Sequence, residues 1–200
     1  LYMEDWSNAA AMADAVINGG KYSLLSANSF ISMFATGGTS EAIFEIQNTD
    51  VDNRGSDSLG GMYRATGYGD YLPARDLLDL IDPNDLRWGW FRTDPNLTGI
   101  YASHRVDKWP TPQNYDNVPV IRLAEVYLNR APAVTATGQA LIDEILIERR
   151  IELGYEGHSI HDLMRNKRGI SRVDYTGDVA NMPYPCNFCI LPIPQPETDT

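Results

Sequence analysis

The sequence predicts a mainly α-helical protein in which long irregular segments connect the helices. Three stretches carry this prediction, because their apolar residues recur at intervals of three and four: residues 5–17, 120–131 and 139–153. Strand-like alternation is confined to residues 41–47, which fit either a short strand or a turn of helix. We therefore expect at least four helices and little sheet.

The first helix is expected to begin after Asp5, since aspartate is a favourable N-cap residue. Its apolar stripe is rich in alanine, which lets a neighbouring helix approach closely. The stripe consists of Trp6, Ala9, Ala10, Ala13, Val16 and Ile17. The sequence Asn18-Gly19-Gly20 follows, and glycine commonly ends a helix at its C-terminus.

Two irregular segments occupy the middle of the chain, on either side of a short helix expected at residues 73–81. Residues 49–71 are rich in Gly and Asp, which predicts a long surface loop, and a loop of this length is usually functional. Residues 87–117 form the second irregular segment. Aromatic residues gather in both, with three tyrosines in the first and three tryptophans in the second.

The last third of the chain predicts three helices and an extended tail. The helix at residues 120–131 is apolar around most of its circumference and should be deeply buried. The helix at residues 139–153 has an apolar face interrupted by charge, and a short helix is expected at residues 158–166. Prolines at positions 183, 185, 192, 194 and 196 favour an extended path for the final residues.

The composition excludes some partners. The 200 residues include 27 Asp and Glu against 16 Lys and Arg, a net charge of −11. Nucleic acids require basic groups to neutralise their phosphates, so no nucleic-acid partner is expected. Simple adsorption to anionic lipid is disfavoured for the same reason. No apolar run approaches the roughly 20 residues of a membrane span, and a neutral ligand such as a sugar is compatible with the acidic charge.

The two cysteines, Cys186 and Cys189, have the spacing C-x-x-C. A structural zinc site needs four ligands, and no second pair of cysteines is present. Redox catalysis requires this motif at the start of a helix, whereas Pro183 and Pro185 precede it. We therefore expect loop thiols, either free or joined in a local disulfide, and no bound metal.

The most enzyme-like cluster is formed by Glu156, His158, His161 and Asp162. Two histidines three positions apart on a helix could share a metal, and Asp162 could orient an imidazole as a general base. The competing interpretation is structural, since charged residues of both signs at a helix corner neutralise each other. We favour the structural interpretation and expect no catalytic residue, metal or cofactor.

Aromatic side chains are the remaining candidates for ligand binding. Sugars present flat C–H faces that stack on Tyr and Trp, while their hydroxyl groups bond polar side chains. Alternatively, aromatic residues in long loops pin the loop to the core. The candidate binding residues are Tyr63, Tyr68, Tyr71, Trp88 and Trp109.

Three stretches together carry a family resemblance. Residues 117–131 read N-V-P-V-I-R-L-A-E-V-Y-L-N-R-A, residues 148–165 read E-R-R-I-E-L-G-Y-E-G-H-S-I-H-D-L-M-R, and residues 191–197 read L-P-I-P-Q-P-E. In this order they resemble the C-terminal region of the SusD/RagB family of outer-membrane nutrient-binding lipoproteins. Residues 5–22 resemble the second helix of a tetratricopeptide-like pair in that family, and residues 122–131 resemble the first helix of a later pair.

The resemblance implies a mainly α fold of tetratricopeptide-like helix pairs, an α-α superhelix with long decorating loops. It implies a lipid-anchored protein at the outer-membrane cell surface. Such a protein binds an oligosaccharide or another nutrient and delivers it to a SusC-like TonB-dependent transporter. The family has no invariant binding motif, so the resemblance assigns no binding residue.

The sequence departs from the family at three points. We expect residues 1–200 to be the C-terminal part of a single SusD-like domain, because the N-terminal half and the lipid anchor are missing. Pro132 follows the helix at residues 120–131 where the family helix continues, so a gap is expected near residues 131–132. Ser159-Ile160-His161 replaces the family's arginine and two aromatic residues.

Other functions stay open from the sequence. One is a tetratricopeptide-type protein–protein interaction domain, which would present an apolar groove made by helices. Another is a peptide-binding relative of the same family. A third is a hydrolase, in which Glu156 and His161 would converge in a solvent-filled cleft.

Overall fold

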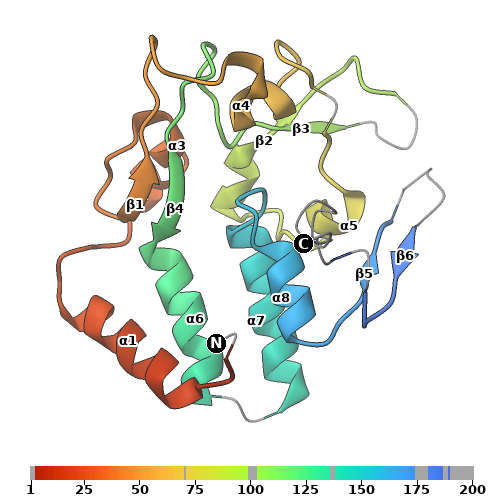
Figure 1. The fold of residues 1–200 in the computed structure, drawn as a ribbon. Coiled ribbons are helices and arrows are strands. Elements are labelled where there is room, and N and C mark those ends of the chain that lie inside the picture. Colours follow the sequence, from red (N-terminus) through yellow and green to blue (C-terminus); the bar gives the residue numbers. More distant parts are fainter. Residues whose placement is uncertain are drawn as a thin grey trace, which may run out of the picture.

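A computed structural model describes residues 3–69, 71–98, 103–135, 138–173, 180–186 and 189. Figure 1 shows two halves, with longer helices in the lower part and loops, short helices and small sheets in the upper part. We call the first the helical half; it contains α1 (Trp6–Asn18), α6 (Leu123–Thr135), α7 (Gln139–Glu152) and α8 (Ser159–Arg165). We call residues 21–117 the loop half. The predicted mainly α fold is confirmed.

Helix α1 packs against α6, and α6 against α7 (Figure 1). The Asp5 side chain accepts a hydrogen bond from the backbone N–H of Asn8 at 3.2 Å, which confirms the predicted N-cap. Ala13 is buried against Leu123 and Val126 of α6. The small alanine side chain lets the two helix backbones approach, as expected from the alanine-rich stripe.

None of the described helices has the length and apolar character needed to traverse a bilayer.

The helix predicted from residue 120 begins three residues later. Val118–Arg122 form strand β4, which pairs antiparallel with β1 (Ala42–Ile46). A short apolar run fits a strand as well as a buried helix, so periodicity alone could not separate the two. Helix α6 then passes through Ala131 and Pro132 to Thr135. A segment missing from the sequence at that point stays a prediction.

The two segments predicted to be irregular contain short regular elements, so that part of the prediction is wrong. The first includes η1 (Gly55–Asp57) and α4 (Leu59–Tyr63). The second includes η2 (Leu86–Trp90) and a hairpin of β2 (Phe91–Thr93) with β3 (His104–Val106). The remaining elements of the loop half are α2 (Ala27–Phe30), α3 (Met33–Thr36) and α5 (Arg75–Leu78).

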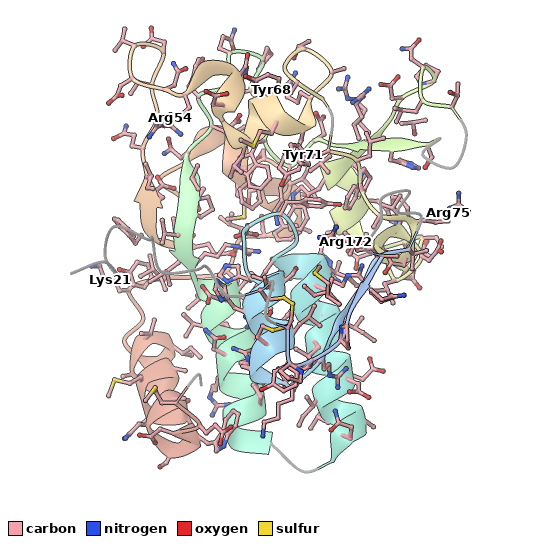
Figure 2. All side chains as sticks on the ribbon, turned by 45° about the vertical axis from the view of Figure 1, so that its right-hand side comes forward. Lys21, Arg54, Tyr68, Tyr71, Arg75 and Arg172 are labelled. Carbon is pink, nitrogen blue, oxygen red and sulfur yellow. A yellow bond between two sulfur atoms is a disulfide. The ribbon has the colours of Figure 1, made fainter. Side chains whose placement is uncertain are left out.

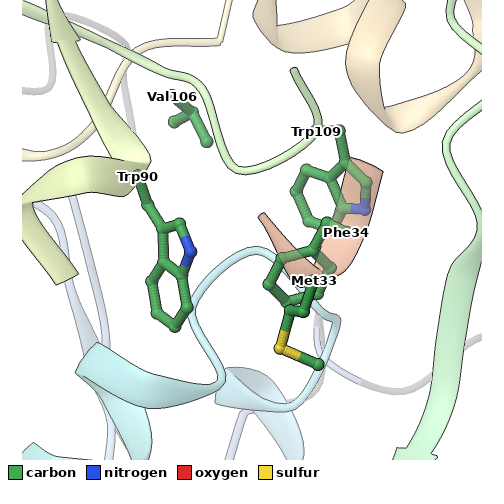
Figure 3. Packing of buried hydrophobic residues seen from close by; sticks show 5 residues of the cluster. All are labelled: Met33, Phe34, Trp90, Val106 and Trp109. Carbon is green, nitrogen blue, oxygen red and sulfur yellow. The ribbon is translucent and has the colours of Figure 1, made fainter. Parts of the chain in front are cut away.

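Large aromatic side chains form the centre of the loop half. Figure 3 shows Trp90, Trp109 and Phe34 packed with Met33 and Val106. Each of the three rings is only 1% exposed. Phe34 contacts both indoles edge-on, with ring centroids 5.7 Å from Trp90 and 5.6 Å from Trp109. This core joins α3, η2 and the segment after β3.

The C-terminal region contains a small hairpin and a disulfide. Strands β5 (Ile170–Ser171) and β6 (Asn181–Met182) pair antiparallel. Cys186 and Cys189 form a disulfide bond, which is one of the two states expected for these thiols. The stretch 191–197, on which part of the family resemblance depends, lies outside the described residues.

Candidate functional site

An open cleft of about 910 Å³ lies between the loop half and the end of α7. One wall comes from the β1–β4 sheet, where Ile46, Val118 and Pro119 line it. The opposite wall includes Leu72 and Leu77 near α5. The turn after α7 completes the lining with Gly154, Tyr155, Glu156 and Gly157. Segments far apart in the sequence therefore meet at this cleft.

The loop with three tyrosines borders this cleft, and a shorter segment within it is closed by its own backbone. The backbone N–H of Tyr68 donates to the carbonyl of Gly61 at 2.8 Å. At Gly67 a β-carbon would lie 2.0 Å from the same carbonyl oxygen, so only glycine allows this approach. We call this crossing of residues 61 and 67–68 the neck. It holds residues 62–66 as a closed loop.

Tyr63 lies in the cleft wall and anchors the aromatic group. Its ring stacks on Trp109 at 5.7 Å between centroids, with 16° between the ring planes. It also makes T-shaped contacts with Tyr155 and Tyr71, at 5.2 Å and 6.1 Å between ring centroids. Burial raises the pKa of the Tyr63 hydroxyl, and the neighbouring Tyr71 raises it further. Tyr63 therefore links the buried core to the rim of the cleft.

Tyr68 and Tyr71 are the exposed members, at 57% and 59% of their surface. Figure 2 shows both in the loop half, beside α4. The Tyr68 hydroxyl donates to Asp57 at 3.0 Å, a residue that lines the cleft. This hydrogen bond raises the pKa of Tyr68. Neither ring lines the cleft itself, but Tyr68 is bonded to Asp57 and Tyr71 contacts Tyr63, so we place both rings at its rim.

Polar side chains accompany these rings. Asp57 and Arg54 line the cleft, and among the described residues no side-chain bond to Arg54 is present. Arg150 also lines it and donates to Asp76 at 2.7 Å. A carboxylate acceptor and a guanidinium donor therefore stand next to exposed rings, which is the combination that hydroxyl-rich ligands require.

The two candidate tryptophans, Trp88 and Trp109, do not lie with the exposed tyrosines. Trp109 borders the cleft, but it is 1% exposed and lies behind Tyr63. Trp88 does not line the cleft; its indole N–H donates to the Asp82 carbonyl at 3.0 Å, and its ring contacts Phe91. Of the five candidate residues, Tyr63, Tyr68 and Tyr71 come together and Trp109 supports them from the core.

The sequence predicted that the charged residues at the helix corner would pair, but it missed their partners from distant segments, Arg122, Lys108 and Glu41. Arg122 on β4 donates to Glu41 at 2.8 Å and to Glu152 at 2.6 Å. It also donates to both carboxylate oxygens of Glu156 at 2.9 Å. Lys108, 1% exposed, donates to Glu156 at 2.6 Å. These charges satisfy each other inside the protein, which makes their burial tolerable.

The pKa values of this network follow from burial and pairing. Burial disfavours the charged amine and lowers the pKa of Lys108 to about 8, although Glu156 opposes the shift. Burial also acts on Glu156, but the attraction of Lys108 and Arg122 outweighs it and lowers the pKa of that carboxyl. Glu156 therefore stays ionised and paired at neutral pH.

The residues of the enzyme-like cluster are dispersed by the fold. Glu156 belongs to the ion pairs of Arg122 and Lys108. Asp162 is buried and pairs with Arg149 at 2.8 Å. His158 lies 3.8 Å from Glu125, and His161 is exposed on α8. The four side chains do not converge in the cleft, and Glu156 and Asp162 have the structural role that the sequence favoured.

Comparison with known proteins adds structural relatives. Neither a sequence-family model nor a curated protein sequence matches the chain. A SusD superfamily protein from Bacteroides vulgatus matches with a TM-score of 0.85 and 25% identity, over 98% of this chain and 53% of that one. A second, from Bacteroides thetaiotaomicron, matches with a TM-score of 0.83 and 25% identity, over 99% and 55%.

A third structure includes a ligand. It is surface glycan-binding protein A from Bacteroides thetaiotaomicron in complex with laminarihexaose, with a TM-score of 0.73 and 20% identity, over 99% of this chain and 59% of that one. The chain described above spans just over half the length of each of these three structures.

Proposed function

Since this chain has the fold of the SusD superfamily, we propose that its cleft binds carbohydrate without chemical conversion. The observation that carries the proposal is the pair of exposed rings, Tyr68 and Tyr71, beside a cleft lined by the polar side chains of Asp57 and Arg54. Surface tyrosines of this kind offer both an apolar face and a hydroxyl group.

Stacking supplies much of the affinity in this proposal. A sugar's hydroxyl groups exchange bonds with water for bonds with protein, which gives little net free energy. Its C–H faces gain roughly 25 cal/mol for each Å² of apolar surface removed from water. Tyr71 is braced by Tyr63, and Tyr68 by Asp57, so both rings are oriented before a ligand arrives. Binding is weak and reversible, as a receptor that hands on its ligand requires.

Asp57 and Arg54 would select the ligand. The carboxylate of Asp57 accepts hydrogen bonds from sugar hydroxyl groups, and the guanidinium of Arg54 donates to ring and hydroxyl oxygens. Nearby Glu156 is engaged by two buried cations and does not act on the ligand as an acid or base. This arrangement supports binding and not hydrolysis.

The cellular role proposed here goes beyond the cleft. We infer an outer-membrane, lipid-anchored nutrient receptor at the cell surface that delivers its ligand to a SusC-like TonB-dependent transporter. The disulfide between Cys186 and Cys189 supports a location outside the reducing cytosol. The structural relatives, one of them a surface glycan-binding protein, support the same role.

A glycan array followed by calorimetry tests the proposal. The wild-type protein is expected to bind at least one oligosaccharide, with laminarihexaose included among the probes. Tyr68→Ala and Tyr71→Ala should each weaken binding by about 1 kcal/mol, or about fivefold. Tyr127→Ala is a matched control, because Tyr127 is also exposed but lies on α6 outside the cleft.

Three results would contradict the proposal. They are the absence of any array signal, equal affinity in both cleft variants and wild type, and release of cleaved sugar during the titration. Selective binding of peptides with no oligosaccharide signal would favour the peptide-binding alternative.

A further inference from the structure

Lys108 occupies an unusual position for a charged residue. It follows β3 in the loop half, yet its side chain is 1% exposed and lies beneath the C-terminal end of α7. Its ammonium group faces the rings of Trp90 at 4.2 Å and Phe34 at 4.8 Å. Two aromatic faces and one carboxylate thus replace the water that a surface lysine would have.

The ammonium group caps helix α7. It donates to the backbone carbonyl of Glu152 at 2.9 Å and to that of Gly154 at 3.0 Å. Carbonyl groups at a helix C-terminus have no donor within the helix, and a cation there also interacts favourably with the helix dipole. Arg122 donates to the Glu152 carbonyl as well, at 2.7 Å. Among these contacts, only Lys108 reaches the Gly154 carbonyl.

The two residues on either side of Tyr155 are therefore both held by Lys108. It bonds the carbonyl of Gly154 before Tyr155 and the side chain of Glu156 after it. Tyr155 itself has φ = 67°, a left-handed backbone conformation that is uncommon for a residue other than glycine and that favourable contacts must offset. The hydrogen bonds from Lys108 to Gly154 and Glu156 hold the backbone of Tyr155 in this conformation.

Tyr155 transmits this restraint to the cleft. Its ring lines the cleft and meets Tyr63 at 5.2 Å, and Tyr63 in turn meets Tyr71 at the rim. We propose that Lys108 is a positioning residue for the cleft, because it fixes the turn after α7 so that Tyr155 braces Tyr63 and, through Tyr63, Tyr71. The inference rests on the proposed function only where it concerns ligand affinity.

The first experiment reads the geometry without a ligand. In the wild-type protein the Tyr155 ring protons, assigned with the help of Tyr155→Phe, should show ring-current shifts from Tyr63 and Phe91. In Lys108→Met these signals should move toward the positions of exposed tyrosines. Val126→Ala, which opens a space between α1 and α6, is a destabilised control that should leave them unchanged. A folded Lys108→Met protein with unchanged Tyr155 signals would overturn the proposal.

A pH titration of the wild-type protein gives a second readout if Lys108→Met does not fold. The charged groups that face the amine are Glu156 and Glu152 at the end of α7 and Arg122 on β4, while Glu41 and Arg87 bond to these from other segments. The pKa of Lys108 is about 8. Deprotonation removes one of the three N–H groups that bond Glu152, Gly154 and Glu156. The Tyr155 signals should shift with that midpoint between pH 7 and 9.5. Wild-type Tyr155 signals at the positions of exposed tyrosines throughout this range would overturn the proposal.

The affinity experiment separates this inference from the proposed function. On the same glycan array, Lys108→Met should bind at least fivefold more weakly than wild type, and Val126→Ala should bind as wild type does. If wild-type protein binds no oligosaccharide, the proposed function fails, but the Tyr155 signals still decide the role of Lys108. If Lys108→Met binds as tightly as wild type, the positioning role is contradicted.

Discussion

The two halves of the molecule are stabilised in different ways. In the helical half the contact between α1 and α6 is made by small aliphatic residues, Ala13, Leu123 and Val126. In the loop half the core consists mainly of large rings, and the network beneath it includes the buried amine of Lys108. Buried charges occur in both halves: Lys108 and Asp116 lie in loops, whereas Arg149, Glu152 and Asp162 lie on α7 and α8.

The difference follows from backbone hydrogen bonding. A helix satisfies most of its own N–H and C=O groups, so it needs only an apolar stripe to pack. Loops leave these groups unpaired, and side chains must satisfy them. Asn48 donates to the Asp116 carbonyl at 2.7 Å, and Arg105 donates to that of Gly69 at 2.7 Å. Polar side chains in the loop half thus replace the hydrogen bonds that helices make internally.

Arg122 joins the two halves, so its loss should give the largest effect. Arg122→Met leaves Glu41, Glu152 and Glu156 with fewer cationic partners in a buried site. Removing one partner of a buried ion pair is strongly destabilising, and we expect a loss of about 5 kcal/mol in the free energy of unfolding. Urea unfolding followed by circular dichroism measures it. A loss below about 2 kcal/mol would show that the network contributes little to the junction.

The aromatic core should come next. Trp90→Ala removes a fully buried ring together with its contact to the Lys108 ammonium group, and we expect a loss of about 4 kcal/mol. Leu123→Ala is the counterpart in the helical half and should cost about 3 kcal/mol. Equal or reversed losses in urea unfolding would contradict the view that the loop half depends more on single large side chains.

The pH dependence of stability isolates Lys108. Its pKa falls from 10.5 to about 8 on burial, so between pH 8 and 10.5 the unfolded chain binds more protons than the folded protein. The titration of Lys108 therefore makes the free energy of unfolding rise with pH in this window. The free energy of unfolding of wild type minus that of Lys108→Met should increase from pH 7 to 9.5. The tyrosines, with ordinary pKa values near about 10, contribute little below about pH 9. A flat or falling difference up to about pH 9 would show that the amine is not desolvated.

The smallest effect is expected at a helix cap in the loop half. The Ser58 hydroxyl accepts a hydrogen bond from the Gly61 N–H at 3.0 Å at the start of α4. Ser58→Ala should reduce the free energy of unfolding by about 1 kcal/mol. Ser58→Thr retains an acceptor and should behave closer to wild type. An unchanged midpoint in Ser58→Ala would mean that α4 is stabilised by its tyrosine contacts alone.

The helical half could be predicted more fully from sequence than the loop half. The periodic stripes and Asp5 located α1, and the pattern at residues 139–153 located α7 to within one residue of its observed end at Glu152. These signals are local, because residues three and four apart share a helix face. Strand β4 was missed since its partner β1 lies far away in the sequence.

The candidate site was predictable only in its exposed part. The tyrosines stood out in a Gly-rich loop, and Tyr155 had a weaker signal as an aromatic residue between Gly154 and Gly157 at a helix end. Lys108 gave none, because its partners lie 44 to 48 residues away. Arg122 and Glu41 are 81 residues apart. Such pairs become visible only when the chain is folded.

The neck at Gly61 and Gly67 makes residues 62–66 a replaceable module. The loop is closed by its own backbone, through the Tyr68 N–H and the Gly61 carbonyl at 2.8 Å. Residues 62–66 could be exchanged for other sequences while both glycines keep the ends in register, provided that Tyr63 is retained to contact Trp109. Loop libraries built between these two glycines would therefore vary the surroundings of Tyr63 while the rings of Tyr68 and Tyr71, outside the neck, keep their places.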